Sequence, residues 1–111
     1  MAGTDLLVEV TDDNFGQEIG QHDGLALVDM WATWCGPCQR VAPVVEQLAE
    51  DYEGKVKVAK MDVDHNQKTP MEFGVRSIPT LLLFKGGSLV DQVVGAVPKE
   101  ALVQKIEQHL D

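Results

Sequence analysis

The chain has 111 residues, of which 44% are hydrophobic and 24% charged, and both values are typical of one compact domain. We therefore expect residues 1–111 to form a single domain. The formal net charge of -9 repels a phosphate backbone and disfavours nucleic acid as a direct partner. The apolar run 6–8 near the amino terminus lacks a basic flank and is too short for a signal peptide or a membrane span. This favours a cytoplasmic protein without a membrane partner.

The first half of the chain predicts two strands and two helices. A strand is expected over Leu6–Val10, and Thr11 is placed to cap the short helix that follows. The apolar run Leu25–Trp31 is typical of a central strand covered on both faces, and Asp29 is the one charged residue in it. A long amphipathic helix ending before Gly54 is predicted by apolar residues at helical spacing, namely Val41, Val44, Val45, Leu48, Ala49 and Tyr52.

The second half continues the alternation of strands and helices. The predicted elements are a strand over Val56–Val63, a short helix over Gln67–Phe73, a strand over Thr80–Phe84, a hairpin turn at Gly86-Gly87, a strand over Ser88–Val94 and a helix from about Pro98. This order predicts an α/β fold. We expect a three-layer α/β/α sandwich, with about five strands in a mixed central sheet and about four helices on its two faces.

The two cysteines, Cys35 and Cys38, lie between the strand that contains Asp29 and the long helix. Residues three apart on a helix have β-carbons ~5 to 6 Å apart, and slight tightening allows a reversible disulfide. Free backbone amides at the helix start favour a thiolate on Cys35, with the N–H groups of Gly36 and Cys38 as candidate donors. Cys35 is therefore the expected attacking sulfur, and Cys38 is expected to be buried.

Two other interpretations of the cysteine pair remain open at this point. A zinc site needs about four ligands, but the chain has no second cysteine pair, and His22, His65 and His109 lie in scattered predicted loops and termini. Two inert core cysteines are the other alternative, although an adjacent Gly-Pro and an exposed helix start are unusual for core positions. We therefore expect no metal.

Asp29 is a candidate general base. Alternation along its strand places the side chain on the same face as Leu25, Leu27 and Trp31, where burial should raise the pKa of the carboxyl group. A raised pKa suits proton transfer near neutral pH. The alternative is a solvated aspartate at a strand end.

Several motifs together resemble the thioredoxin family. They are the WCGPC motif at 34–38, the upstream Asp29, the Ile78-Pro79-Thr80 segment and the Gly95-Ala96 turn. The resemblance extends from about Leu6 to Leu110. It implies the thioredoxin fold and a monomeric thiol-disulfide oxidoreductase that reduces protein disulfides through a mixed-disulfide intermediate. It also implies that a separate thioredoxin reductase, usually NADPH-dependent, reduces the chain again. No dinucleotide-binding fingerprint is present, so we expect no bound nicotinamide or flavin cofactor beyond the cysteine disulfide.

The resemblance also implies roles for individual residues. Cys35 resembles the nucleophile and Cys38 the resolving thiol, while Asp29 resembles the buried carboxylate that exchanges a proton with Cys38. Lys60 resembles the cation that tunes this carboxylate. A cis Ile78-Pro79 bond is expected beside the cysteines, with the backbone there pairing with an extended substrate segment. The expected substrate-binding residues are Trp34, Gly36, Pro37, Ile78, Pro79, Val94, Gly95 and Ala96.

The chain departs from the common family pattern at Met30, Thr33, Gln39-Arg40 and Ser77. None of these positions touches the sulfur chemistry directly, so the departures bear on partner preference and redox potential.

Two alternative functions remain. One is a disulfide isomerase or oxidant domain, against which the Gly-Pro spacer, the lack of an export signal and Asp29 argue. The other is a non-redox subunit that binds a partner through the apolar surface around Trp34.

Overall fold

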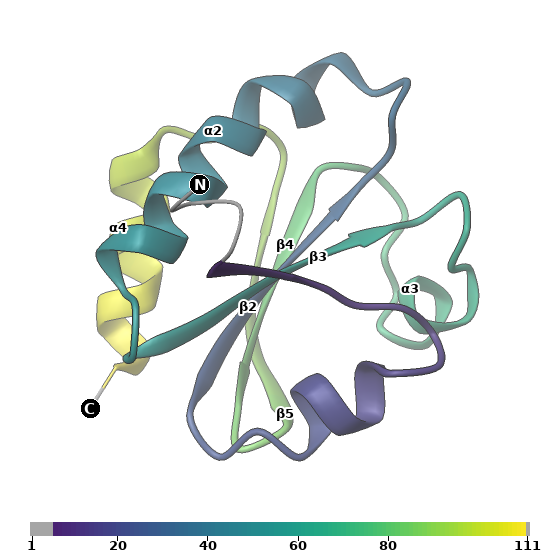
Figure 1. Cartoon of the computed structure of the whole chain (residues 1–111). Helices are drawn as coiled ribbons and strands as arrows, with labels where there is room; N and C mark the ends of the chain where they lie inside the picture. The colour runs from purple at the N-terminus through teal and green to yellow at the C-terminus, as the bar shows by residue number, and fades with distance from the viewer. Residues whose placement is uncertain (1–5, 111) are drawn as a thin grey trace.

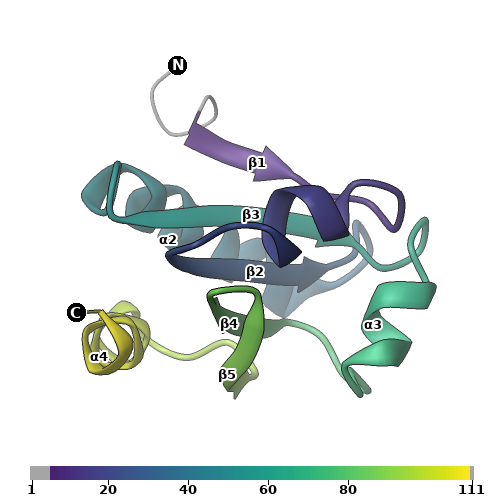
Figure 2. The ribbon, with the colours of Figure 1, turned by 90° about the horizontal axis from the view of Figure 1, so that it is seen from below.

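A mixed five-stranded sheet forms the centre of the molecule in the computed structural model, which describes residues 6–110. The strands are β1 (Leu7–Glu9), β2 (Leu25–Trp31), β3 (Val56–Asp62), β4 (Thr80–Lys85) and β5 (Ser88–Val94). Their order across the sheet is β1-β3-β2-β4-β5, which Figure 2 shows from top to bottom. β1, β3 and β2 are parallel, whereas β4 is antiparallel to both of its neighbours. The apolar strand β2 therefore lies in the middle, as its sequence predicts.

Helices cover both faces of the sheet (Figure 1). α2 (Gly36–Asp51) and α4 (Lys99–His109) pack on one face, while η1 (Gly16–Gly20) and α3 (Lys68–Glu72) lie on the other. Successive side chains of a strand point to opposite faces, so Leu25 and Leu27 of β2 join the first core and Ala26 and Val28 join the second. The mixed sheet with four helices on its two faces confirms the predicted fold class. Within residues 6–110, no helix has both the length and the apolar character needed to cross a bilayer.

The predicted elements are all present, with ends that shift by one or two residues. The first strand pairs only over Leu7–Glu9, one residue shorter at each end than predicted. The predicted short helix is a single π-type turn, in which Gln21 N–H donates to the Gly16 carbonyl at 2.9 Å. Thr11 Oγ1 accepts a hydrogen bond from Asn14 N–H at 3.2 Å and so caps the turn at 12–14, whereas η1 itself begins after Phe15 without a side-chain cap.

α3 is capped from a distant part of the chain. The residue before this helix, Gln67, makes no side-chain cap, but Asp12 accepts hydrogen bonds from Thr69 N–H and Oγ1 at 2.9 and 2.7 Å and from Lys68 N–H at 3.2 Å. Asp12 lies in the loop after β1 and α3 follows β3, so this contact joins the segments that follow two neighbouring parallel strands. It anchors the segment that continues from α3 to Pro79.

Gly87 is expected to be the glycine most sensitive to substitution. Its φ is +84°, and a β-carbon there would collide with the carbonyl oxygen of Gly20, which is rigid backbone. We expect Gly87→Ala to lower the free energy of unfolding by about 2 to 3 kcal/mol, measured by urea denaturation. Gly16→Ala is the control, since nothing lies within 4 Å of its β-carbon. Equal stabilities for the two variants would contradict the close approach of the β4–β5 hairpin to η1.

Candidate active site

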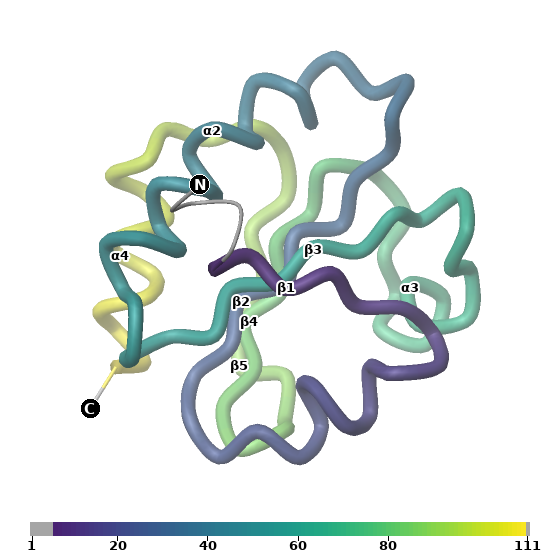
Figure 3. Tube along the Cα trace, viewed as in Figure 1, coloured from purple at the N-terminus to yellow at the C-terminus, as the bar shows by residue number. Residues whose placement is uncertain are grey.

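Three segments that are far apart in the sequence meet at one edge of the sheet (Figure 3). In the antiparallel registers, Met30 of β2 is opposite Thr80 of β4, and Thr80 is opposite Val94 of β5. The carboxyl end of β2, the amino end of β4 and the carboxyl end of β5 therefore lie together. This arrangement brings the cysteine loop, the 78–79 segment and the 94–96 turn to the same edge, where sites of α/β sheets are usually found.

The cysteine pair sits at the amino terminus of α2. Cys35 is the N-cap with extended backbone angles, φ -88° and ψ 108°, and it forms a disulfide with Cys38 across a Cα–Cα distance of 5.2 Å. The predicted disulfide geometry is therefore confirmed. Cys38 N–H donates to Cys35 Sγ at 3.1 Å, as predicted, whereas among the described residues Gly36 N–H makes no such bond. One backbone amide is thus already oriented toward the first sulfur.

Burial does not distinguish the two cysteines, because Cys35 is 3% exposed and Cys38 is 2% exposed. The exposed helix start that the sequence predicts consists of the flanking residues 34, 36 and 37 instead. The surroundings of the two cysteine sulfurs do differ. Cys35 Sγ lies 3.8 Å from the carbonyl oxygen of Ile78, next to the protein surface. Cys38 lines a cavity that is partly open to solvent, together with Asp29. Each sulfur therefore has its own chemical environment.

Asp29 lies in that cavity, which has a volume of about 120 Å³. The residue is 3% exposed, and its Oδ1 has no hydrogen-bond partner among the described residues. Burial raises the pKa of the Asp29 carboxyl group to about 7, and the charge of Lys60 partly opposes the rise. The predicted buried carboxyl group is confirmed, and the solvated aspartate is excluded. The cavity is lined by Leu7, Asp29, Trp31, Cys38, Gln39, Ala42, Val45, Glu46 and Lys60.

Lys60 is held close to Asp29 by the sheet itself. The two residues are register partners on the parallel strands β2 and β3. Lys60 Nζ also lies 5.5 Å from the centroid of the Trp31 ring, a distance suited to a cation–π contact. The half-buried Lys60 therefore places a positive charge near the Asp29 carboxyl group.

The expected substrate-binding residues form an apolar rim around the disulfide. Trp34 is 69% exposed and Val94 is 55% exposed, and residues 36, 37 and 96 are also exposed. Ile78 and Gly95 are half-buried, whereas Pro79 is buried and offers little open surface. The Ile78-Pro79 peptide bond is cis, as predicted. Gly95 N–H donates to the Pro79 carbonyl at 2.8 Å, which ties the 94–96 turn to the cis segment.

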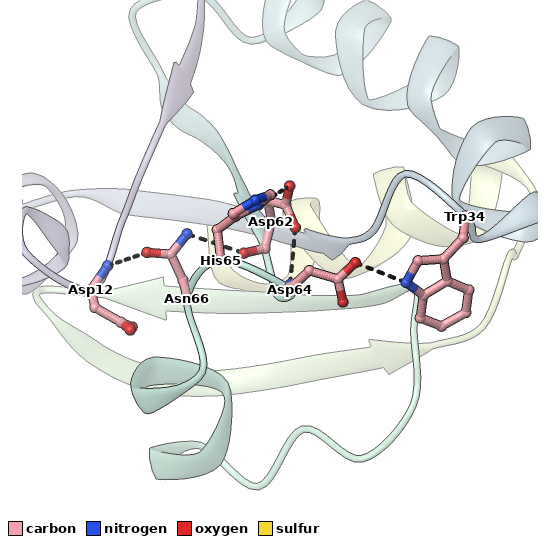
Figure 4. Close-up of polar contacts among 6 residues, drawn as sticks. All are labelled: Asp12, Trp34, Asp62, Asp64, His65 and Asn66. Carbon is pink, nitrogen blue, oxygen red and sulfur yellow. Dashed lines mark hydrogen bonds and ion pairs between the residues drawn. The ribbon is translucent and has the colours of Figure 1, made fainter.

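A network of polar contacts starts at the Trp34 indole (Figure 4), and the sequence did not predict it. Trp34 Nε1 donates to Asp64 Oδ2 at 2.8 Å, and Asp64 N–H donates to Asp62 Oδ1 at 2.9 Å. Asp62 also faces His65 Nδ1 at 2.9 Å and accepts from Asn66 Nδ2 at 3.0 Å through its carbonyl. The sequence contained a signal for this network, since Asp62 ends β3, Asp64 follows it closely, and β3 is parallel to β2, which leads to Trp34. What the sequence could not show is the orientation of the indole.

Loss of the Asp64 carboxylate should loosen the Trp34 ring. We expect Asp64→Ala to lower kcat/KM for a protein disulfide about two- to thirteenfold, because one exposed hydrogen bond contributes roughly 0.5–1.5 kcal/mol. The Trp34 fluorescence anisotropy should fall in parallel. Asp64→Asn keeps an acceptor at this position and should retain most of the activity. If the alanine variant matched the parent in both measurements, Asp64 would have no role in orienting Trp34.

Comparison with known proteins shows the family. The sequence profile of the family described as Thioredoxin matches residues 6–108. The chain belongs to the thioredoxin family. It is 54% identical to thioredoxin 2 of Chlorobaculum tepidum over 102 residues, which are 92% of this chain and 94% of that protein. It is 56% identical to thioredoxin 1 of a Nostoc species, over 92% of this chain and 95% of that protein. It is also 56% identical to the thioredoxin of Staphylococcus saprophyticus, over 94% and 98% of the two chains.

Membership of the thioredoxin family identifies the chemistry of the cysteine pair. The chain is a thiol-disulfide oxidoreductase with protein-disulfide reductase activity, and its redox-active centre is the cysteine disulfide itself. Thioredoxins in general act on disulfide substrates and depend on a reductase partner. Among residues 6–110, no group of three or more His, Cys, Asp and Glu side chains is placed to hold a metal ion.

Proposed function

We propose that Cys35 is the nucleophile, Cys38 the resolving thiol and Asp29 the base of the resolving step, with Lys60 tuning Asp29. The observation that carries this assignment is the asymmetry of the pair. Cys35 Sγ accepts an amide hydrogen bond at the amino terminus of α2, while Cys38 lines the same cavity as a carboxyl group whose pKa is about 7. A group with that pKa changes its protonation state near neutral pH, as a general base requires.

The first step is attack of the Cys35 thiolate on a substrate disulfide. A bond forms between Cys35 Sγ and one substrate sulfur, the substrate disulfide bond breaks, and the other substrate sulfur leaves as a thiolate. The N–H of Cys38 stabilises the negative charge on Cys35 Sγ, and the helix start adds a smaller effect of ~0.3 to 1 kcal/mol. The product is a mixed disulfide between Cys35 and the substrate.

The second step releases the reduced substrate. Cys38 gives its proton to the Asp29 carboxylate and attacks Cys35 Sγ, so that the Cys35–Cys38 bond forms and the mixed disulfide breaks. The second substrate sulfur leaves with the electron pair of that bond. Overall the substrate gains two electrons and the cysteine pair loses two. The proton then rests on Asp29, where burial favours the neutral acid.

Substrate binding is proposed to use the backbone at Ile78 and the apolar rim. Among the described residues, Ile78 makes no backbone hydrogen bond of its own, and its carbonyl lies 3.8 Å from Cys35 Sγ. An extended substrate segment can pair with this free backbone as an added strand, which places its sulfur beside Cys35. Trp34, Pro37 and Val94, with residues 36, 95 and 96, supply apolar contact on either side, and Pro79 supports the segment from below.

The partner that regenerates the dithiol is proposed to be an NADPH-dependent thioredoxin reductase, and residues 1–111 are proposed to act as one monomeric domain in the cytoplasm. Nothing in the acidic composition favours nucleic acid. The test is reduction of insulin disulfides by the purified chain with NADPH and a thioredoxin reductase. Turnover that requires all three components supports the proposal. Insulin reduction that does not depend on the chain contradicts it.

Equilibration with glutathione distinguishes a reductase from an isomerase or oxidant. We expect a reduction potential nearer to about -270 mV than to the about -180 mV of a disulfide isomerase. The first value is that of thioredoxin itself and is not obtained from this structure. A potential in the isomerase range would overturn the reductase direction. Full cellular activity of the double Cys35→Ser, Cys38→Ser variant would instead support the non-redox binding subunit.

A further inference from the structure

The side chain of Gln39 reaches back across the loop that carries the two cysteines. Gln39 lies near the start of α2, directly after Cys38, and its Nε2 donates to the Thr33 carbonyl at 2.9 Å. The backbone N–H of Gln39 also donates to the Cys35 carbonyl at 3.2 Å. The hydrogen bond between Gln39 and Thr33, called the Gln39 clamp below, therefore encloses the whole motif at 34–38.

The disulfide is nested inside the Gln39 clamp. Cys35 and Cys38 close the segment 35–38 covalently, and the clamp closes the segment 33–39 around it. Ordering a loop costs conformational entropy, so a hydrogen bond that already holds the outer segment lowers the entropic cost of closing the inner one. Such coupling is reciprocal, since a disulfide that makes the clamp easier to form is stabilised by the clamp in the same proportion. The clamp should therefore favour the disulfide over the dithiol.

The other hydrogen bonds of this loop do not make the same connection. Cys35 N–H donates to the Ala32 carbonyl at 3.2 Å, which closes a turn that ends before Cys38. Cys38 N–H donates to Cys35 Sγ, so that bond depends on a sulfur that reacts. Among the described residues, the hydrogen bond from Gln39 to Thr33 is the one that ties the segment before Cys35 to the helix after Cys38 without using a reacting atom.

We propose that Gln39 is a positioning residue, whose side-chain N–H holds Cys38 within reach of Cys35 while the pair is reduced. This inference rests on the proposed role of Cys38 as the resolving thiol, and it adds the group that sets how readily the pair closes. A loop that is already closed around both sulfurs raises their effective concentration toward each other. Gln39 makes and breaks no covalent bond, because the two electrons pass from the cysteine pair to the substrate disulfide with or without the clamp.

Gln39→Met tests this proposal, because methionine is similar to glutamine in length and uncharged but has no N–H donor in its side chain. The variant disulfide and the parent dithiol are equilibrated with each other in a glutathione buffer, and the four forms are quantified by mass spectrometry after alkylation of the thiols. We expect the equilibrium constant to favour the parent disulfide about two- to fivefold. The reduction potential of the variant is then higher by about 10 to 20 mV, since a tenfold change corresponds to about 30 mV. The shift is small because one hydrogen bond between exposed residues is worth about two- to thirteenfold in total.

Gln47→Met is the matched control, because it removes another exposed glutamine of α2 whose Oε1 accepts a hydrogen bond from Lys99 Nζ, away from the cysteines. Its equilibrium constant against the parent should be close to one. Gln39→Lys keeps a donor of similar reach and should recover the value of the parent at high salt, where the added charge is screened. No shift in Gln39→Met, an equal shift in Gln47→Met, or no recovery in Gln39→Lys would overturn the proposal.

Kinetics separate this inference from the proposed function. An aromatic disulfide releases one coloured thiolate when the first cysteine attacks and a second when the other cysteine resolves. In Gln39→Met the second release should slow about two- to fivefold, while the first release keeps its rate. An unchanged second release, or equal slowing of both releases, would overturn the proposal. The equilibrium with the parent does not depend on which sulfur attacks, so a failure of Cys38→Ser to trap substrate on Cys35 would refute the proposed roles and leave the test of the clamp valid.

Discussion

Replacing Cys35 with serine should abolish disulfide reduction, whereas replacing Cys38 with serine should leave the first step intact and trap the substrate on Cys35. The loss for Cys35→Ser is expected to be about a thousandfold or more, because a hydroxyl group is a far weaker nucleophile than a thiolate at neutral pH. Cys38→Ser still forms the mixed disulfide but has no internal thiol to displace it. Mass spectrometry should therefore find substrate attached through Cys35.

Both serine variants are expected to fold, so that a loss of activity reports on the missing thiol. Both cysteines are buried and serine is close in volume to cysteine, so each variant should fold, which circular dichroism checks. The reciprocal Cys35→Ser variant should trap little substrate through Cys38, which is 2% exposed and lines the cavity beside Asp29. Trapping mainly through Cys38 would reverse the assigned roles of the two sulfurs.

Asp29→Asn is expected to stabilise the protein at neutral and alkaline pH. The folded pKa of Asp29 is about 7 and its ordinary value is 3.8, so the folded state binds this proton more tightly than the unfolded state. The free energy of unfolding of the parent therefore falls as pH rises from about 4 to about 7, and the loss is complete above that. A difference of about three pKa units corresponds to a loss of the order of 4 kcal/mol.

The variant lacks this titration, so its gain over the parent should grow through that pH window and reach a plateau near about pH 8. Urea denaturation of both proteins at several pH values measures the difference directly. Asp13→Asn, which makes the same substitution at an exposed position, is the matched control. A stability difference that did not change with pH would mean that Asp29 is already ionised in the folded protein.

The same substitution should slow the chemistry while it stabilises the fold. An asparagine cannot accept the Cys38 proton, so the resolving step should fall by about a hundredfold near neutral pH, within the range typical of a lost general base. Attack by Cys35 should be nearly unaffected. Stopped-flow measurement of both steps separates the two effects. A resolving step with an unchanged rate and pH profile would remove Asp29 from the mechanism.

Local patterns in the sequence were sufficient to predict most of the fold. Hydrophobic patterns together with proline and glycine positions predicted the strands and helices, and alternation along β2 placed Asp29 on the core face beside Leu25 and Leu27. Helix-start chemistry placed Cys35 at the cap of α2, where the structure has it. These features depend on neighbouring residues in the sequence, so local propensity and hydrophobic pattern are enough to predict them. The cis bond at Pro79, by contrast, was predicted only through the family resemblance.

Contacts between distant segments could not be predicted in the same way. The bond from Trp34 to Asp64 joins residues 30 apart, and the cap that Asp12 gives to Thr69 joins residues 57 apart. Both depend on how the loops after β1, β2 and β3 converge at one edge of the sheet, which no local pattern encodes. The Trp31 N–H, which has no hydrogen-bond partner among residues 6–110, is of the same kind, because it becomes visible only when the groups around the cavity are known.

Titration of the two thiols in the reduced protein is the most direct test of the assigned roles. Carbon NMR of protein labelled at both cysteine β-carbons follows each sulfur separately. Cys35 is expected to ionise first and below the about 8.5 of a free cysteine, and the Cys38 signal should also respond to Asp29 near its pKa of about 7. Ionisation of Cys38 before Cys35, or of both thiols together at the pH of a free cysteine, would contradict the assignment of Cys35 as nucleophile and Cys38 as resolving thiol.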